Sequence, residues 1–272
     1  MKFDNLNPLF ASKESVPWVG NVMASRWAYE GMAVTQYTDN EYEKKFFEEK
    51  KMHSFAQFKT TYYLNEIKQR VDFITINKED SEKTIEVNKA IEVVKNELAS
   101  ELSYFDGVLD CENCIESVSS ELTKPQAKVI KSFLKNARTY YNEMSNRYSN
   151  DLDSISEFIG KQRLQELQNN YANKALEMFV TNANDFDKII ESNGKLIQKI
   201  DPIYNIPDED TGVFGAHFYA PRKFFFGKEM STLSVNIIVI WGMTLILVIT
   251  LFMNLLKRTL DGVERIARRV KK

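Results

Sequence analysis

Residues with special backbone or metal-binding roles are few in this sequence. It has two histidines, two cysteines, six prolines and ten glycines among 272 residues. Such a composition is neither fibrous nor disordered, and 43% hydrophobic content is enough to bury a core. The formal net charge is −2, so the general excess of positive charge that is typical of nucleic-acid-binding proteins is missing. We expect no nucleic-acid partner.

Motifs for nucleotide binding and for catalysis are also missing. The glycines form neither G-x-x-x-x-G-K-[ST] nor G-x-G-x-x-G, and the sequence has no G-x-S-x-G. His53 and His217 stand far apart, with no H-E-x-x-H between them. Acidic runs such as 208–210 have polar neighbours, whereas catalytic carboxylates need apolar burial or a fixed partner. We therefore predict that the chain is not an enzyme and has no catalytic, cofactor-binding or metal-binding residues of its own.

Charged residues are absent from one long segment, Met230 to Leu256. A helix over residues 233–256 would be about 36 Å long, which exceeds the ~30 Å hydrocarbon core of a bilayer. We therefore predict a transmembrane helix over residues 230–256. Polar and small residues in a lipid span usually face other helices, so we expect other transmembrane helices as partners. The residues expected at that contact are Asn236, Trp241, Gly242 and Asn254.

The charges on either side of this segment predict its orientation. Residues 257–272 carry seven Lys or Arg and two Asp or Glu, a net charge of +5. Because basic residues collect on the cytoplasmic side, we expect a cytoplasmic tail over 257–272 and an extracytoplasmic location for the bulk of the chain, in the inner (cytoplasmic) membrane. The tail could form an interfacial helix on anionic membrane lipid or remain solvated, and its sequence fits both equally.

Helical periodicity dominates the middle of the chain. Apolar residues recur every three or four positions, for example over 87–105 and 130–148, on otherwise polar helices. Thr123 before a Lys-Pro pair marks a helix start, and residues 149–151 are expected to separate two long helices. Strand signals are nearly absent. The predicted fold class is all-α, with an antiparallel extracytoplasmic helical bundle over residues 41–201 and one C-terminal transmembrane helix.

Two segments flank the predicted bundle. Residues 1–40 include a stretch rich in the apolar and aromatic side chains that settle at membrane interfaces, so we expect a membrane-proximal or re-entrant segment there. Residues 202–229 contain three prolines, three glycines and Phe224-Phe225-Phe226. This composition predicts an ordered loop that returns the chain to the membrane, with the aromatic triplet at the headgroup level.

The two cysteines are close together, in Cys111-Glu112-Asn113-Cys114. A redox C-x-x-C normally follows a strand, and a zinc site needs a second pair of ligands, whereas both flanks here are helical. In an oxidising compartment, a local disulfide between Cys111 and Cys114 is the favoured interpretation. Free thiols are the main alternative, and a redox or metal role comes last.

Arg26 and Glu30 are four positions apart and would share one face of a helix. An exposed pair of this kind adds only about 0.2–0.5 kcal/mol to helix stability, but an unpaired charge is costly at a membrane. Their aromatic neighbours place the pair at such an interface. The candidate gate or interface residues are Ser25, Arg26, Trp27, Tyr29 and Glu30.

Two stretches of the sequence resemble a known family. Ser25-Arg26-Trp27-Ala28-Tyr29-Glu30-Gly31-Met32, followed by Gln36-Tyr37, resembles the segment after the fifth transmembrane helix of ATP-binding-cassette (ABC) transporters of the white/pleiotropic-drug-resistance type, the G subfamily. His217-Phe218-Tyr219-Ala220-Pro221-Arg222-Lys223, then Phe226-Gly227, Asn236 and Ile240-Trp241, is similar to the C-terminal end of the long ABC transporters of Bacteroidetes. Those proteins carry an ATPase, a six-helix permease and an enlarged helical domain before the sixth helix.

The resemblance implies that the chain is the C-terminal part of such a permease, from the end of transmembrane helix five onward. An upstream ATPase domain would bind ATP and magnesium, and the full transporter would be a homodimer. Residues 25–37 would close the outer gate or substrate exit. Upstream spans would also explain export, because the N-terminus lacks the apolar run of a signal peptide. The chain begins at Met1 just after the expected fifth helix, so we expect a fragment or a separately encoded piece.

The alternative function is a single-span sensor or adaptor. Its extracytoplasmic bundle would bind a ligand or partner, and the span would pass a shift to the basic tail. Such a protein needs a signal sequence or a second span near its own N-terminus, and the sequence shows neither. An exported enzyme is a distant third hypothesis. The sequence counts against it because it contains no nucleophile–base constellation. The transported substrate and the direction of transport have no signature in the sequence.

Overall fold

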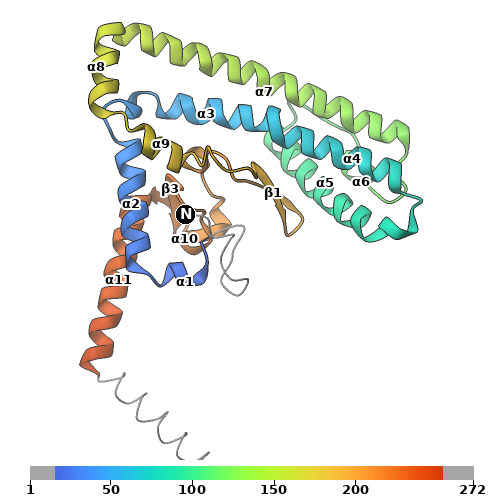
Figure 1. The fold of residues 1–272 in the computed structure, drawn as a ribbon. Helices are drawn as coiled ribbons and strands as arrows, with labels where there is room; N and C mark the ends of the chain where they lie inside the picture. The colour runs from blue at the N-terminus through green and yellow to red at the C-terminus, as the bar shows by residue number, and fades with distance from the viewer. Residues whose placement is uncertain (1–15, 254–272) are drawn as a thin grey trace, which may run out of the picture.

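The computed structural model describes residues 16–253, and most of them are helical (Figure 1). The long helices of the body are α3 (Phe47–Phe58), α4 (Leu64–Asn77), α5 (Thr84–Phe105) and α7 (Lys124–Ile159). The shorter ones are α1 (Trp18–Asn21), α6 (Cys114–Ser117), α8 (Lys161–Tyr171), α9 (Lys174–Val180) and α10 (Gly212–Gly215), with 3₁₀ turns at Glu43–Lys45, Ser81–Lys83, Pro202–Tyr204 and Glu209–Thr211. The remaining pair of helices, α2 (Ala24–Thr38) and α11 (Thr232–Phe252), pack against each other. A mostly helical fold is therefore confirmed.

Two short antiparallel hairpins contradict the prediction that the chain is entirely helical. β1 (Ile189–Ser192) pairs with β2 (Lys195–Gln198), and β3 (Arg222–Phe225) pairs with β4 (Lys228–Ser231). Each hairpin turns through two residues with positive φ, the geometry of tight two-residue turns. These turn residues are Asn193-Gly194 and Phe226-Gly227. The first hairpin lies within the stretch predicted as bundle, and the second begins within the predicted loop.

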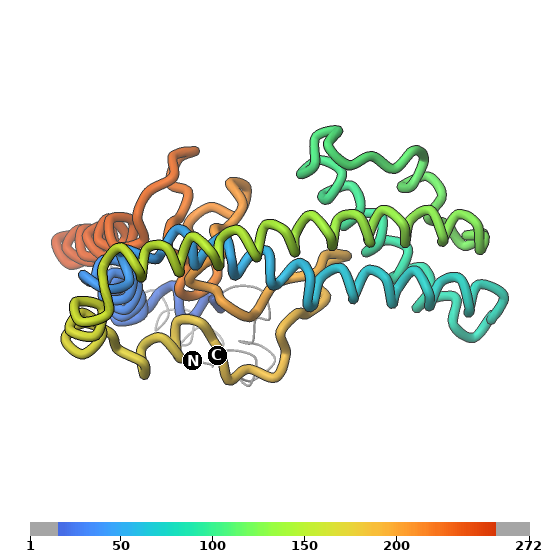
Figure 2. The backbone as a smooth tube through the Cα atoms, turned by 90° about the horizontal axis from the view of Figure 1, so that it is seen from above, coloured from blue at the N-terminus to red at the C-terminus, as the bar shows by residue number. Residues whose placement is uncertain are grey.

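α3 and α4 form one rod because the π turn Lys59–Tyr63 joins them end to end. α7 returns along this rod, and the two lie side by side in both views (Figure 1, Figure 2). The start of α7 confirms the expected signal. The Thr123 hydroxyl accepts a hydrogen bond from the Gln126 backbone, the Gln126 side chain accepts one in return, and proline occupies the first turn.

The predicted break at residues 149–151 is wrong, because α7 continues through it to Ile159. Ser, Asn and Asp are weak helix formers, costing only about 0.5–0.7 kcal/mol each relative to alanine, and they do not forbid a helix. The apolar spacing that keeps one face of α7 toward α3 continues beyond them. The helix ends instead at Gly160, whose φ of 81° is readily adopted only by glycine.

The main core lies where α4, α5, α6 and the first half of α7 meet. It is a cluster of buried aliphatic and aromatic side chains, to which the hairpin β1–β2 adds partly buried residues. Its fully buried members include Ile67, Val71, Ile74, Val94, Leu98, Val118, Leu122, Ile130, Ala137 and Tyr141. A second, smaller cluster joins α2 to α9 and to the segment after Asp201, through Val34, Tyr37, Val180, Ile203 and Tyr219. The helical body, from α3 to α9, is thus packed against α2 and the segment that leads to α11.

Two buried carboxylates cross the main core. Glu97 of α5 accepts hydrogen bonds from the Tyr63 hydroxyl at 2.5 Å and from the Leu196 backbone N–H at 2.6 Å. Glu101, one turn further on, accepts one from the Tyr141 hydroxyl at 2.8 Å and pairs with the Lys59 ammonium group. Buried carboxylates are stable only when partners of this kind satisfy them. Together they hold the π turn, α7 and the hairpin β1–β2 against α5.

α11 is the candidate membrane span. Among residues 16–253, it is the one helix long and apolar enough to cross a bilayer, and only 11% of its most apolar window is buried. It begins at Thr232, two residues after the predicted start. Asn254, the last residues of the predicted span and the tail 257–272 lie outside the described residues, as do residues 1–15.

Candidate functional site

A cluster of charged side chains is buried where α2, α11 and the hairpin β3–β4 meet (Figure 1). We call it the ionic cluster; it consists of Arg26 and Glu30 of α2, Lys223 of β3 and Asn236 of α11. Glu30 and Lys223 are 0% exposed, Asn236 is 1% exposed and Arg26 is 7% exposed. Burial of this many polar groups requires that they satisfy one another.

Three groups from three elements converge on one carboxylate oxygen, Oε2 of Glu30. The Lys223 ammonium donates to it at 2.6 Å, the Asn236 amide donates at 3.0 Å, and an Arg26 guanidinium nitrogen lies 3.3 Å away. The Asn236 side chain also accepts from Lys223 at 3.2 Å and donates to the Trp27 carbonyl oxygen at 2.9 Å. A single carboxylate therefore ties α2 to both the hairpin β3–β4 and α11.

Arg26 is less well satisfied than Lys223. Its guanidinium stacks on the ring of Trp27, 3.9 Å from the centroid, and lies 5.6 Å from the ring of Phe218. Within the described part of the chain, its nitrogens make no hydrogen bond, and neither does Oε1 of Glu30. The cluster thus holds two cations and one anion, and both members of the Arg26–Glu30 pair keep unused hydrogen-bonding capacity.

Burial lowers the proton affinity of two groups near the ionic cluster that lie outside α2 and α11, Lys223 and His217. It lowers the pKa of the Lys223 ammonium group to about 8, although the neighbouring Glu30 carboxylate acts in the opposite direction. Burial likewise lowers the pKa of His217, whose Nε2 donates to the Pro202 carbonyl oxygen at 2.9 Å. His217 is therefore neutral at physiological pH, and Lys223 loses its proton more easily than an exposed lysine does.

The candidate gate residues divide between the inside and the outside of this cluster. Arg26, Trp27 and Glu30 are buried, and the Trp27 indole N–H donates to the Asn21 carbonyl oxygen at 2.9 Å. Ser25 is exposed, and Tyr29 is 50% exposed while it stacks on the ring of Phe218. The pairing of Arg26 with Glu30 on one helix face matches the spacing argument.

The residues expected to face other transmembrane helices also divide. Asn236 lies in the ionic cluster and contacts α2 of the same chain. Trp241 is 71% exposed, and a Cβ on Gly242 would meet nothing within 4 Å, so both remain open to neighbours outside this chain. Lys223 was missed as a cluster member. Its only signal was its position within the transporter-like segment that precedes the span.

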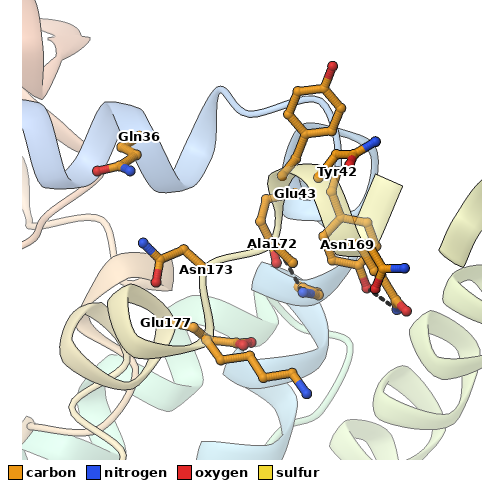
Figure 3. A pocket seen from close by; sticks show the side chains of 12 residues that line it. Gln36, Tyr42, Glu43, Asn169, Ala172, Asn173 and Glu177 are labelled. Carbon is orange, nitrogen blue, oxygen red and sulfur yellow. Dashed lines mark hydrogen bonds and ion pairs between the residues drawn. The ribbon is translucent and has the colours of Figure 1, made fainter. Parts of the chain in front are cut away.

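A polar cavity of about 750 Å³ opens at the other end of α2 (Figure 3). It lies between the end of α2, the turn that follows, the start of α3 and the connection from α8 to α9. Figure 3 shows Gln36, Glu43, Asn173 and Glu177 arranged around it, so segments far apart in the sequence supply its wall. A second cavity of about 470 Å³ shares Lys50, Lys174 and Glu177 with the first.

The two cysteines line neither the polar cavity nor the ionic cluster. The structure joins Cys111 to Cys114 by a disulfide, at the start of α6 and beside the main core. Formation of this bond in the cell stays a prediction. In residues 16–253, no three His, Cys, Asp or Glu side chains gather as metal ligands would.

Comparison with known proteins identifies no family for this chain. No protein-family model, no curated protein and no solved structure matches the sequence. The transporter resemblance of residues 25–37 and 217–241 therefore stays a hypothesis. The ionic cluster and the polar cavity both gather polar side chains from distant segments, and we take them as the candidate sites.

Proposed function

We propose that this chain is the C-terminal part of an ABC transporter permease, in which it contributes to the outer gate or substrate exit. The observation that carries the proposal is the ionic cluster. It fixes α2, which bears the transporter-like segment, to the membrane helix α11 through Glu30, Lys223 and Asn236. A movement of the span would therefore be passed directly to α2 and, through the second core cluster, to the helical body.

The surface of α11 supports a place among other membrane helices. Its side chains beyond the ionic cluster are large, apolar and exposed, which is unfavourable in water. They include Trp241, Leu245, Ile246, Leu247, Leu251 and Phe252. Lipid and the other transmembrane helices of the permease would cover this surface. In the proposed transporter, ATP and magnesium bind to an upstream ATPase domain, and the transporter is a homodimer.

The groups of the ionic cluster can form two alternative sets of hydrogen bonds. Glu30 now uses Oε2 for three partners, while Oε1 and the Arg26 nitrogens make no hydrogen bond in the described structure. A small rotation of the carboxylate would let Arg26 bind both oxygens and would weaken the hold of Lys223. ATP-driven closure elsewhere could select between these arrangements, which is how packed interfaces convert small shifts into larger ones.

The rest of the chain takes its place from this proposal. The helices within residues 41–201 form an antiparallel bundle outside the inner membrane, and residues 257–272 form the cytoplasmic tail. A local disulfide between Cys111 and Cys114 fits an oxidising compartment. The second candidate function, a single-span sensor or adaptor, is favoured by one observation. The polar cavity beside α2 has the size of a small-molecule site, about 300–1,000 Å³.

The proposed orientation can be tested by cysteine labelling in spheroplasts. In a chain with Cys111→Ser and Cys114→Ser, Asn150→Cys is exposed on α7 and should react with a membrane-impermeant maleimide. Arg268→Cys should react only after lysis, because the positive-inside rule places it in the cytoplasm. Labelling of Arg268→Cys in intact spheroplasts, with Asn150→Cys protected, would reverse the topology.

A photo-crosslinker in place of Trp241 separates the two candidate functions. A benzoylphenylalanine at this exposed position should couple to a membrane protein whose sequence includes further spans and a phosphate-binding loop. The matched control is the same probe at Phe158, which is 94% exposed on the helical body and should not give that product. Adducts with lipid alone would contradict the permease and favour the single-span sensor.

A further inference from the structure

The polar cavity is lined mainly by neutral hydrogen-bonding side chains. Five of its lining residues carry side-chain amides, which both donate and accept hydrogen bonds. They are Gln36, Gln168, Asn169, Asn170 and Asn173. Gln168 donates to the Tyr42 hydroxyl and Asn173 caps α9, but Gln36, Asn169 and Asn170 make no side-chain hydrogen bond within the described chain. These three amides are available to a ligand.

The charges in the wall balance one another. Lys50 donates to Glu43 at 2.6 Å, and Glu43 itself is buried, so this pair is already satisfied. Lys174 and Glu177 complete the charged lining with one cation and one anion. A phosphate or nucleotide site needs an excess of cationic donors, and a cation site needs an excess of carboxylates. This cavity offers neither, which favours a ligand without net charge.

Aliphatic surface is nearly absent from the wall. Ala172 is the one aliphatic lining residue, whereas sites for lipids and drug-like molecules are lined mostly by hydrophobic groups. Tyr42 and Tyr171 supply aromatic surface of another kind, because a phenol ring combines an apolar face with a hydroxyl that donates and accepts. Amides together with tyrosines suit a ligand that presents hydroxyl groups on its edges and C–H groups on its faces.

The second cavity extends the same chemistry. It shares Lys50, Lys174 and Glu177 with the first, and its remaining wall contains the hydroxyl groups of Ser54, Thr181 and Tyr204. Its charges also balance, because Glu177 and Asp201 offset the two shared lysines. Two adjacent neutral lobes with a common wall match a ligand made of repeated polar units.

We propose that these two lobes bind a neutral oligosaccharide, with its hydroxyl groups on the amides of α8 and its rings against Tyr42 or Tyr171. The proposal does not depend on the transport function, because the site is built from α2, α3, α8, α9 and the segments that connect or follow them, without α11. It applies equally to a permease domain or to a sensor.

The test is calorimetric titration of the full chain in detergent. The probes are linear di- and tetrasaccharides of glucose, of mannose and of N-acetylglucosamine, with inorganic phosphate and glutamate as charged alternatives. We expect saturable binding of at least one tetrasaccharide, and no binding of phosphate or glutamate. Failure of all six saccharides at millimolar concentration, or tighter binding of either charged probe, would overturn the proposal.

Substitutions locate the binding to the lobes. Asn169→Ala and Asn170→Ala should each weaken tetrasaccharide binding about three- to tenfold, the effect of one lost hydrogen bond. Gln165→Ala, on an exposed turn of α8 that does not line the cavity, should change it less than twofold. Gln57 lines only the second lobe, so Gln57→Ala should weaken binding of the tetrasaccharide more than binding of the disaccharide. Equal effects of Gln165→Ala and Asn169→Ala would contradict this location.

Discussion

Glu30→Gln should detach α2 from α11 more effectively than any other single change in the ionic cluster. The substitution keeps the size of the side chain but removes the only negative charge that faces Arg26 and Lys223 within the described structure. Two buried cations would then lack an anion. Removing one partner of a buried ion pair typically costs about 3–5 kcal/mol, so we expect an effect of this order.

Loss of either cation should be milder, both for Lys223 at 2.6 Å from Glu30 and for Arg26 at 3.3 Å. Lys223→Met leaves Glu30 with Arg26 and Asn236, and Arg26→Gln leaves it with Lys223 and Asn236. Each change reduces the net charge of the cluster from +1 to zero, whereas Glu30→Gln raises it to +2. The ranking therefore follows from the charge balance of the cluster.

Trp27 offers a direct measurement of this effect. It is fully buried against Arg26, whereas Trp18 and Trp241 are exposed and can be replaced by phenylalanine. In that background, Glu30→Gln should shift the emission of Trp27 to longer wavelength and lower the melting temperature in detergent. Glu166→Gln breaks an exposed pair with Arg163 and is the matched control, with an expected cost below about 1 kcal/mol. Equal shifts in both variants would contradict the buried cluster.

A double-mutant cycle shows which cation is the true partner. Glu30→Gln with Lys223→Met should cost less than the sum of the single changes, because the first change already removes what Lys223 binds. Glu30→Gln combined with Arg26→Gln still leaves Lys223 unpaired. The cost of this double change should therefore lie closer to the sum of its two single changes. In the transporter that we propose, Glu30→Gln should also reduce transport without destabilising the helical body. Strict additivity in both cycles would mean that Glu30 contributes no ion pair.

The sequence predicts half of this cluster. Arg26 and Glu30 are four residues apart on one helix, so helical periodicity is enough to bring them together. Lys223 follows Glu30 by 193 positions and reaches it through the hairpin β3–β4. No periodic pattern encodes such a contact, because it depends on how the hairpin packs against two helices. The sequence predicts that Asn236 contacts another helix. That this helix is α2 of the same chain follows only from the tertiary packing.

The missed hairpins have a different cause. Asn193-Gly194 stands between two four-residue strands and is a strong short-range hairpin signal, because both positions require positive φ. Each strand has four residues, which is too short for an alternation of apolar and polar residues to stand out from the helical periodicity of the neighbouring sequence. The polar cavity could not be predicted at all, since its wall joins Gln36 to Asn173 across more than a hundred residues.

Glu101→Ala should destabilise the helical body by about 3 kcal/mol, the second large effect expected in this chain. Glu101 is 1% exposed and joins the Lys59 ammonium group to the Tyr141 hydroxyl. Its removal leaves both groups without their acceptor and opens a cavity beside α5 and α7. Tyr141→Phe removes only one hydrogen bond and should cost about 1 kcal/mol.

The measurement is denaturant unfolding of the chain in detergent, followed by circular dichroism at a helical wavelength. Asp72→Ala is the matched control, because it also removes a carboxylate paired with a lysine, Lys131. There the two side chains are 42% and 34% exposed, so water replaces the lost partner and the cost should stay below about 1 kcal/mol. Similar losses for Glu101→Ala and Asp72→Ala would mean that water reaches Glu101. In that case the contacts of Glu101 with Lys59 and Tyr141 would add little to the packing of the π turn and α7 against α5.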